Sequence, residues 1–71
     1  MKVRFTHHAH VSMRERGISV SQITGALRRP DSIVEVKGSA NGCLKKFGKQ
    51  TLMVVFRQTV REYVIITAYY L

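Results

Sequence analysis

Residues 2–16 change from a strand-like to a helical spacing of apolar positions. The segment Lys2–Phe5 alternates cationic and apolar side chains, and this period of two indicates a short edge strand. Thr6 follows and can cap a helix through its hydroxyl group, so a first helix is predicted from about residue 7 to residue 16. Gly17 ends this helix, because glycine readily adopts the left-handed conformation that closes a helical C-terminus.

A second helix is predicted between Ser19 and Pro30. Ser19 and Gln22 have the spacing of a capping box, in which each side chain bonds to the backbone N–H group of the other residue. The apolar positions that share one stripe of this helix are Val20, Ile23, Ala26 and Leu27. Pro30 ends the helix, because the residue before a proline is disfavoured in the helical conformation.

From Ser32 onward the pattern is typical of strands joined by tight turns. A strand over Ser32–Lys37 is predicted to turn at Asn41-Gly42, the strongest two-residue hairpin signal in the chain. The chain then returns antiparallel over Cys43–Phe47. Gly48-Lys49 is compatible with a second tight turn of type II′, with glycine at its first central position.

Two longer strands, rich in Val, Ile, Phe and Tyr, are predicted over Thr51–Arg57 and Tyr63–Tyr70. A loop centred on Thr59-Val60 would set Arg57 opposite Glu62, an opposite-charge pair worth roughly 0.2–1 kcal/mol. One face then carries Leu52, Val54, Phe56, Tyr63, Ile65 and Thr67, and the other carries Met53, Val55, Val64 and Ile66. Both faces are apolar, so we expect one to pack on the helices and the other to be partly covered by a partner or by sheet twist.

The resulting order β-α-α-β-β-β-β defines an α+β fold in which two helices pack on one face of an antiparallel sheet. Seventy-one residues are fewer than most domains contain, so a single domain over residues 1–71 is predicted. Cys43 is the one cysteine, which excludes an intrachain disulfide and a multi-cysteine zinc site and fits a reducing cytosol. We find neither a membrane span nor a signal peptide, and we expect a soluble cytoplasmic protein.

The charge balance then restricts the class of partner. Twelve Lys and Arg residues against four Asp and Glu residues give a formal net charge of +8, while 45% of positions are hydrophobic. The apolar fraction is too high for a disordered basic arm. A folded domain with this excess of cations has a polyanion as its expected partner, because neutralising phosphates releases condensed counterions. Nucleic acid is favoured over a membrane surface, since no basic amphipathic helix carries aromatic anchors.

The first predicted helix carries the candidate catalytic residues. His8, Ser12 and Arg16 recur every four residues on one stripe, whereas His7, His10 and Arg14 form a different stripe. An imidazole titrates near neutral pH, and a guanidinium can stabilise charge that develops on a phosphoryl oxygen. The alternative is a solvated basic helix face with incidental histidines. We expect no metal and no cofactor, because His7 and His8 point about 100° apart and no further ligand completes a zinc site.

A second group of candidate residues lies in the predicted strands. The expected phosphate-contacting strip at one edge of the sheet consists of Lys45, Lys46, Lys49, Arg57 and Arg61. Lysines on exposed strands also discourage aggregation between sheet edges, so a purely protective role is the alternative. Tyr69 is expected to share a face with Thr67 and Tyr63, where it could stack on a base or donate a proton. The alternative for Tyr69 is a core tyrosine with a solvated hydroxyl.

Several segments together resemble a known family. They are Thr6-His7-His8-Ala9, Met13, Glu15-Arg16-Gly17-Ile18-Ser19, Ile23, Leu27-Arg28-Arg29-Pro30 and Val64-Ile65-Ile66-Thr67-Ala68-Tyr69. With this spacing the chain resembles the domain of unknown function family 4258 over nearly its whole length. That family in turn resembles the barnase/EndoU/colicin/RelE (BECR) group of small nuclease folds, in which toxins of toxin-antitoxin pairs cleave RNA and are inhibited by a cognate antitoxin.

The resemblance implies functional roles for the residues of this chain that match the family motif. It implies that His8 is the family histidine and Arg16 the arginine of the Glu-Arg-Gly-Ile turn. Where the family has an arginine before methionine, this chain has Ser12, and the missing cation implies a degenerate or inactive site.

The leading functional hypothesis is a toxin-like, metal-independent endoribonuclease in which the RNA 2′-hydroxyl attacks the adjacent phosphate. His8 would act as general base or acid, Arg16 with Arg57 or Lys46 would stabilise the transition state, and Tyr69 is a further candidate. The expected partners are RNA or the ribosome and an acidic antitoxin. The alternatives are a non-catalytic RNA- or DNA-binding module and a protein adaptor that uses its apolar sheet face.

Overall fold

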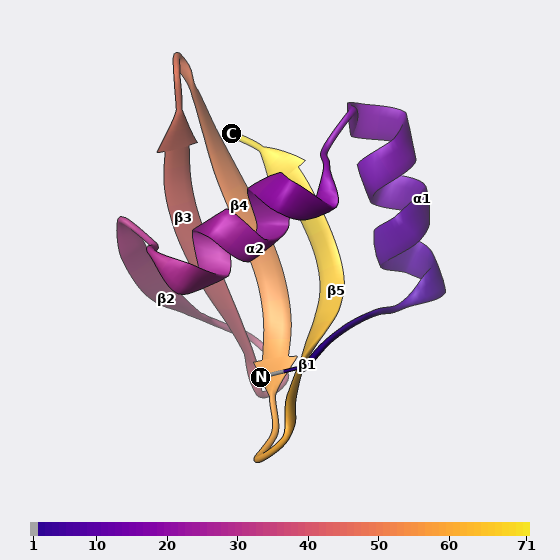
Figure 1. Cartoon of the computed structure of the whole chain (residues 1–71). Helices are drawn as coiled ribbons and strands as arrows, with labels where there is room; N and C mark the ends of the chain where they lie inside the picture. The colour runs from indigo at the N-terminus through magenta and orange to yellow at the C-terminus, as the bar shows by residue number, and fades with distance from the viewer. Residues whose placement is uncertain (1) are drawn as a thin grey trace.

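The computed structural model describes residues 2–71, which form two helices and one five-stranded sheet (Figure 1). The elements are β1 (Lys2–Phe5), α1 (His7–Arg16), α2 (Val20–Arg28), β2 (Ser32–Val36), β3 (Ala40–Phe47), β4 (Gln50–Gln58) and β5 (Glu62–Tyr70). This order confirms the predicted α+β succession.

Both helices begin and end through local hydrogen bonds of the kind predicted. The Thr6 hydroxyl accepts the backbone N–H of Ala9 at 3.1 Å and so caps α1. Gly17 ends that helix in the left-handed conformation, with φ at 65°. The capping box before α2 is complete, because the Gln22 backbone N–H donates to the Ser19 hydroxyl at 3.1 Å and the Ser19 N–H donates to Gln22 Oε1 at 2.8 Å.

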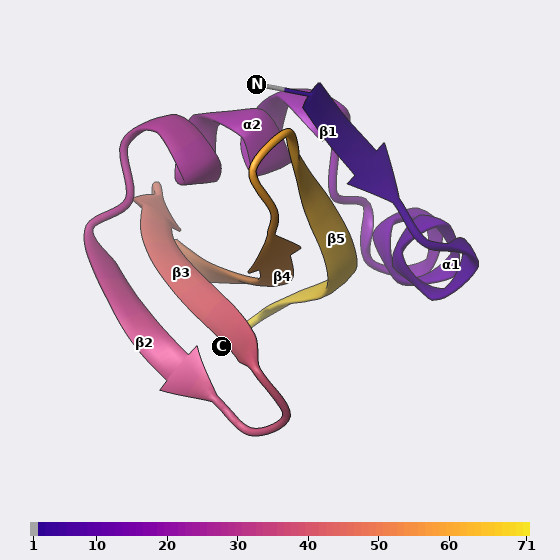
Figure 2. The same ribbon diagram turned by 90° about the horizontal axis from the view of Figure 1, so that it is seen from below.

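The sheet is mixed, with strand order β1-β5-β4-β3-β2 (Figure 2). Strands β2 to β5 form an antiparallel meander, whereas β1 runs parallel to β5, with Val3 opposite Tyr63. The prediction of a wholly antiparallel sheet is therefore wrong for β1. No hairpin connects β1 to β5, so turn geometry does not dictate the direction of β1. An ion pair of 3.2 Å joins Arg4 of β1 to Glu62 of β5.

The predicted turn at Asn41-Gly42 is also wrong. The chain turns at Gly38 and Ser39, which have φ values of 81° and 64°, and Asn41 and Gly42 lie within β3. Gly42 serves close packing instead, because a Cβ atom there would lie 2.7 Å from the terminal methyl group of Met53. The turn predicted at Gly48-Lys49 is confirmed, with φ at 63° for Gly48.

A β-bulge changes the predicted register of the last two strands. Val55 lies opposite Thr67 but Phe56 lies opposite Ile65, so one extra residue enters β5 between them. Arg57 lies opposite Val64 and donates from Nη2 to the Gly38 carbonyl at 3.0 Å. The predicted pairing of Arg57 with Glu62 is therefore wrong. Because side chains alternate along a strand, the bulge also moves Thr67 to the face opposite Tyr63.

The two helices cover different parts of the sheet. Helix α2 lies across one face of the sheet. Helix α1 follows the short β1 strand and lies beside β5 at the edge of the sheet (Figures 1 and 2). The prediction that both helices pack on one face is therefore wrong for α1, whereas α2 does pack on a face of the sheet. The core beneath α2 contains Ile23, Ala26, Cys43, Leu52, Val54, Phe56, Ile65 and Ala68. We call the opposite side the outer face, and its central residues are Leu44, Met53, Val55, Thr67 and Tyr69.

Candidate nucleic-acid interface

The stripe of α1 that carries His8 and Arg16 borders the outer face. Between them, Ser12 is only 2% exposed, and its Oγ lies 3.0 Å from Thr67 Oγ1 in a hydrogen bond. Residues four positions apart share one side of a helix, so this contact places His8 and Arg16 on the side of α1 that adjoins Thr67. Both side chains are exposed. Tyr69 lies two residues further along the same face of β5, opposite Met53.

His8 and Arg16 nevertheless do not meet one another. Eight residues of α-helix separate them by about 12 Å along the axis. A single phosphate would have to lie between the two side chains for both to contact it. The arrangement is therefore an open row of polar groups along a helix, bordering the outer face of the sheet.

The remaining histidines of α1 lie on its other sides. His10 packs its ring on Phe5 with 5.5 Å between the centroids, and His7 is exposed. Within residues 2–71, no three His, Cys, Asp or Glu side chains lie close enough together to hold a metal ion.

The structure separates the residues of the expected phosphate-contacting strip. Lys46 and Lys49 lie at the β3–β4 end of the sheet, while Arg57 and Arg61 lie at the opposite end. Lys46 is opposite Thr51, and the six residues of β4 from there to Arg57 span about 20 Å.

Lys45 lies apart from the others, because its Nζ donates to the Arg29 carbonyl at 2.9 Å at the end of α2. The same Nζ also lies 6.0 Å from the centre of the Phe47 ring. Lys45 therefore has a structural partner, whereas Lys46 and Lys49 are exposed.

Few of the cations are neutralised within the molecule. In the described residues, the ion pair between Arg4 and Glu62 is the one salt bridge, which leaves eleven of the twelve Lys and Arg side chains without a carboxylate partner. Lys45 and Arg57 donate to backbone carbonyls, which does not reduce their charge. The surface therefore keeps most of its positive potential available to an external anion.

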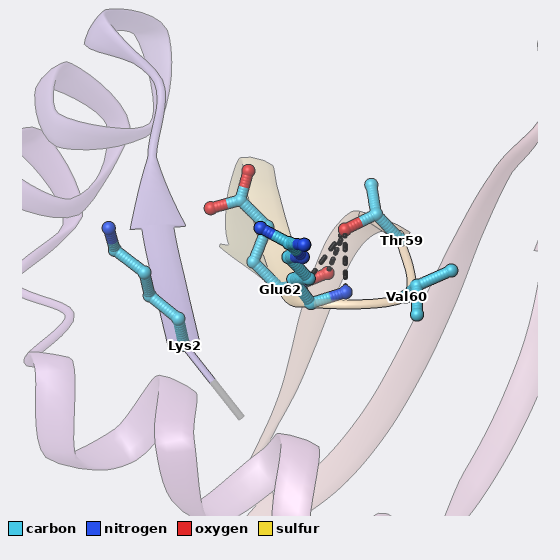
Figure 3. Close-up of a pocket in the computed structure, with 5 residues that line it drawn as sticks. Lys2, Thr59, Val60 and Glu62 are labelled. Atoms are coloured by element: carbon cyan, nitrogen blue, oxygen red, sulfur yellow. Dashed lines mark hydrogen bonds between the residues drawn. The ribbon is translucent and has the colours of Figure 1, made fainter.

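Two cavities lie at the end of the sheet where β1 begins. The first, of about 470 Å³, is lined by Lys2, Thr59, Val60, Arg61 and Glu62 (Figure 3). Its loop is held by the Thr59 hydroxyl, which accepts the backbone N–H of Arg61 at 3.3 Å and of Glu62 at 3.0 Å. Of these lining residues, the sequence indicates only Arg61 as a functional candidate.

The second cavity, of about 340 Å³, is lined by Val3, Thr24, Leu27, Arg28 and Tyr63. Sequence reasoning missed it, because its walls come from three separate elements. Arg28 also lies in the last turn of α2, where cations interact favourably with the helix dipole. The cavity depends on the pairing of β1 with β5, which the sequence pattern does not indicate.

Cys43 lies inside β3 and is only 1% exposed. Burial raises the pKa of the Cys43 thiol from 9.0 to about 11. Between pH 9 and pH 11 the thiol is deprotonated in the unfolded chain but still protonated in the folded chain, which favours unfolding. The contribution of the thiol to the free energy of unfolding is therefore complete below pH 9 and is lost as the pH rises toward 11.

We therefore expect Cys43→Val to flatten the pH dependence of stability. Between pH 9 and pH 11 the unmodified domain should lose roughly 1 to 2 kcal/mol more unfolding free energy than the variant. Urea unfolding at several pH values measures both proteins, and other titrating groups cancel in the difference. Identical pH dependences would show that the thiol does not contribute.

These features define a small basic α+β domain with an open outer face and two cationic ends. The chain belongs to the domain of unknown function family DUF4258, whose family model matches residues 5–70. No curated protein and no solved structure matches it. Over residues 2–71, none of the helices has the length and apolar character required to cross a membrane.

Proposed function

We propose that this domain binds RNA, chiefly through the sugar-phosphate backbone. The observation that carries the proposal is the set of eleven cations without a carboxylate partner on a folded domain of net charge +8. Cations neutralised within the protein would need no external partner, whereas these retain their charge at the surface. Phosphate groups spaced along a flexible chain can contact several of them at once.

The position of the cations favours a single strand. Lys46 and Lys49 lie about 20 Å from the end that carries Arg57 and Arg61, and the surface between them contains Tyr69 and Thr67. A single strand can bend to follow this path, and its unpaired bases can stack on aromatic groups. We therefore favour single-stranded RNA over a rigid duplex.

Salt dependence provides the direct test. Fluorescence anisotropy measures the affinity for a labelled oligoadenylate at several salt concentrations. The logarithm of this affinity should fall linearly with the logarithm of the salt concentration. The slope should be about −0.7 for each phosphate contacted. An oligonucleotide of the same sequence with a neutral methylphosphonate backbone is the control, and it should bind weakly at every salt concentration. Equal binding of the two oligonucleotides would refute backbone recognition.

RNA cleavage is the second candidate function. It is supported by the contact between Ser12 and Thr67, which places the His8 and Arg16 stripe beside the outer face. The resemblance to BECR-type toxin ribonucleases gives these residues the roles of general base or acid and of transition-state stabiliser, with Arg57, Lys46 and Tyr69 as further candidates. The corresponding cellular proposal is a toxin that acts on RNA or ribosomes and is inhibited by an acidic partner protein.

Two matched pairs of variants test cleavage. In the presence of EDTA, the domain should convert RNA to products ending in 2′,3′-cyclic phosphate. His8→Ala and Arg16→Gln should abolish these products. The control variants are His7→Ala and Arg14→Gln, which remove exposed groups of the same kind from the other sides of α1. They should still form these products. Intact RNA that is nevertheless bound would support a binding module without catalysis.

A further inference from the structure

The cavity between α2 and the first residues of β1 and β5 has the features of a subsite for one unpaired base. Its volume of about 340 Å³ is near the lower limit for small-ligand sites. A single flat ring system fits such a space better than a larger ligand does. The cavity is distinct from the α1 stripe and from the outer face, since Val3 and Tyr63 lie on the α2 side of the sheet.

The walls of this cavity are suited to an aromatic ring. Val3, Leu27 and Tyr63 are partly buried against the core and supply apolar surface. The Tyr63 ring is fixed by edge-to-face packing on Phe56, with 5.5 Å between centroids and an interplanar angle of 76°. A tyrosine held in this way offers a preorganised surface on which a base can stack.

The polar groups of the cavity match the edge of a base and its phosphate. Thr24 donates its hydroxyl proton to the carbonyls of Val20 and Ser21, at 3.1 and 3.2 Å, so its oxygen remains available as an acceptor for a base N–H group. Arg28 is exposed, and no carboxylate among the described residues pairs with it, so it can contact a phosphate.

The neighbouring cavity extends the same path. Lys2 precedes Val3 in β1, and Arg61 lies two residues before Tyr63, so the cavity of about 470 Å³ borders the cavity of about 340 Å³. Arg28 lines the smaller cavity, and Lys2 and Arg61 line the larger one beside it. This order suits a nucleotide chain in which one base is inserted and the flanking phosphates remain at the surface.

From this geometry we propose that Val3, Thr24, Leu27, Arg28 and Tyr63 form a pocket for one unpaired RNA base, with its phosphate at Arg28. The proposal rests on the proposed RNA-binding function and adds a contact that depends on the base. Binding should accordingly have two separable components, one that depends on backbone charge and one that depends on stacking at Tyr63.

The experiment compares an oligoadenylate with an abasic ribose-phosphate chain of the same length and charge. The domain should bind the oligoadenylate about tenfold more tightly, because stacking on an aromatic side chain contributes for a base and not for an abasic unit. Tyr63→Leu keeps an apolar side chain against Phe56 and should remove most of this preference, whereas Tyr69→Leu on the outer face should remove less of it. Tyr63→Phe, which keeps the ring, should retain it.

Lys49→Gln is the control for charge, because Lys49 lies at the opposite end of the sheet. It should weaken binding of both chains equally. In NMR spectra, the backbone amide resonances of Val3, Thr24 and Leu27 should change their chemical shifts when adenosine monophosphate is added. Equal binding of the two chains by the unmodified domain, or a preference that is as large in folded Tyr63→Leu as in the unmodified domain, would overturn the base pocket while leaving RNA binding intact. Failure to bind either chain would refute the proposed function itself, and with it the pocket.

Discussion

Replacing Leu52 by alanine should remove a large part of the domain's free energy of unfolding. Leu52 is fully buried in β4, at the centre of the core beneath α2. Truncating a buried leucine to alanine costs about 2 to 5 kcal/mol, which includes the cavity that remains. A chain of this length has roughly 4 to 10 kcal/mol of total stability, so one such change removes a large part of it.

Urea unfolding followed by circular dichroism measures this loss. Ile33→Ala is the matched control, because Ile33 is also an aliphatic strand residue but is 65% exposed. That change should alter stability by less than about 0.5 kcal/mol. A Leu52→Ala protein that unfolds at nearly the same urea concentration as the unmodified one would contradict the described core.

Removing two cations from each end of the sheet should reduce RNA affinity by about a hundredfold at low salt. The changes are Lys46→Gln and Lys49→Gln at one end, and Lys2→Gln and Arg61→Gln at the other. Together they remove half of the net charge of +8. The salt slope should also become shallower by about 0.7 for each phosphate that the variant no longer neutralises.

The control for this prediction uses two cations whose side chains are held by other groups of the protein. Arg4 forms an ion pair with Glu62, and Lys45 donates to the Arg29 carbonyl. Arg4→Gln with Lys45→Gln should weaken binding less than Lys46→Gln with Lys49→Gln, although each pair removes two charges. Equal reductions in affinity would show that binding follows total charge and not the position of the free cations.

The local features of the fold could be predicted from the sequence. The Thr6 cap, the capping box at Ser19 and the left-handed Gly17 depend on residues within one helical turn, and all three are present. The turn at Gly48 is equally local. In each case the residue type restricts the backbone regardless of what the rest of the chain does.

The predictions fail where distant contacts decide the structure. Asn41-Gly42 has the composition of a turn, but the missing side chain of Gly42 makes room for Met53 in the adjacent strand. The bulge in β5 lies where the Thr6 hydroxyl donates to the Ile66 carbonyl at 3.2 Å, an interaction across most of the chain. Neither interaction is visible in the local sequence.

In the candidate site, too, local spacing could be predicted from the sequence, whereas contacts between distant residues could not. Helical spacing correctly groups His8 and Arg16 on one side of α1, but only the Ser12–Thr67 hydrogen bond shows that this side adjoins the outer face. The bulge overturns the expectation that Tyr69 shares a face with Tyr63. Ser12 itself is a packing residue in this chain, which gives a structural reason for a small side chain at this position.

The parallel pairing of β1 with β5 has a consequence for how the chain is synthesised. Of the five strands of this sheet, β1 is synthesised first and pairs only with β5, which is synthesised last, so β1 has no pairing partner until the meander has emerged. Closure of the sheet thus requires that β5 has been synthesised. A nascent chain that stalls before β5 would present the bare edge of β4, which is a template for association with other unfinished chains.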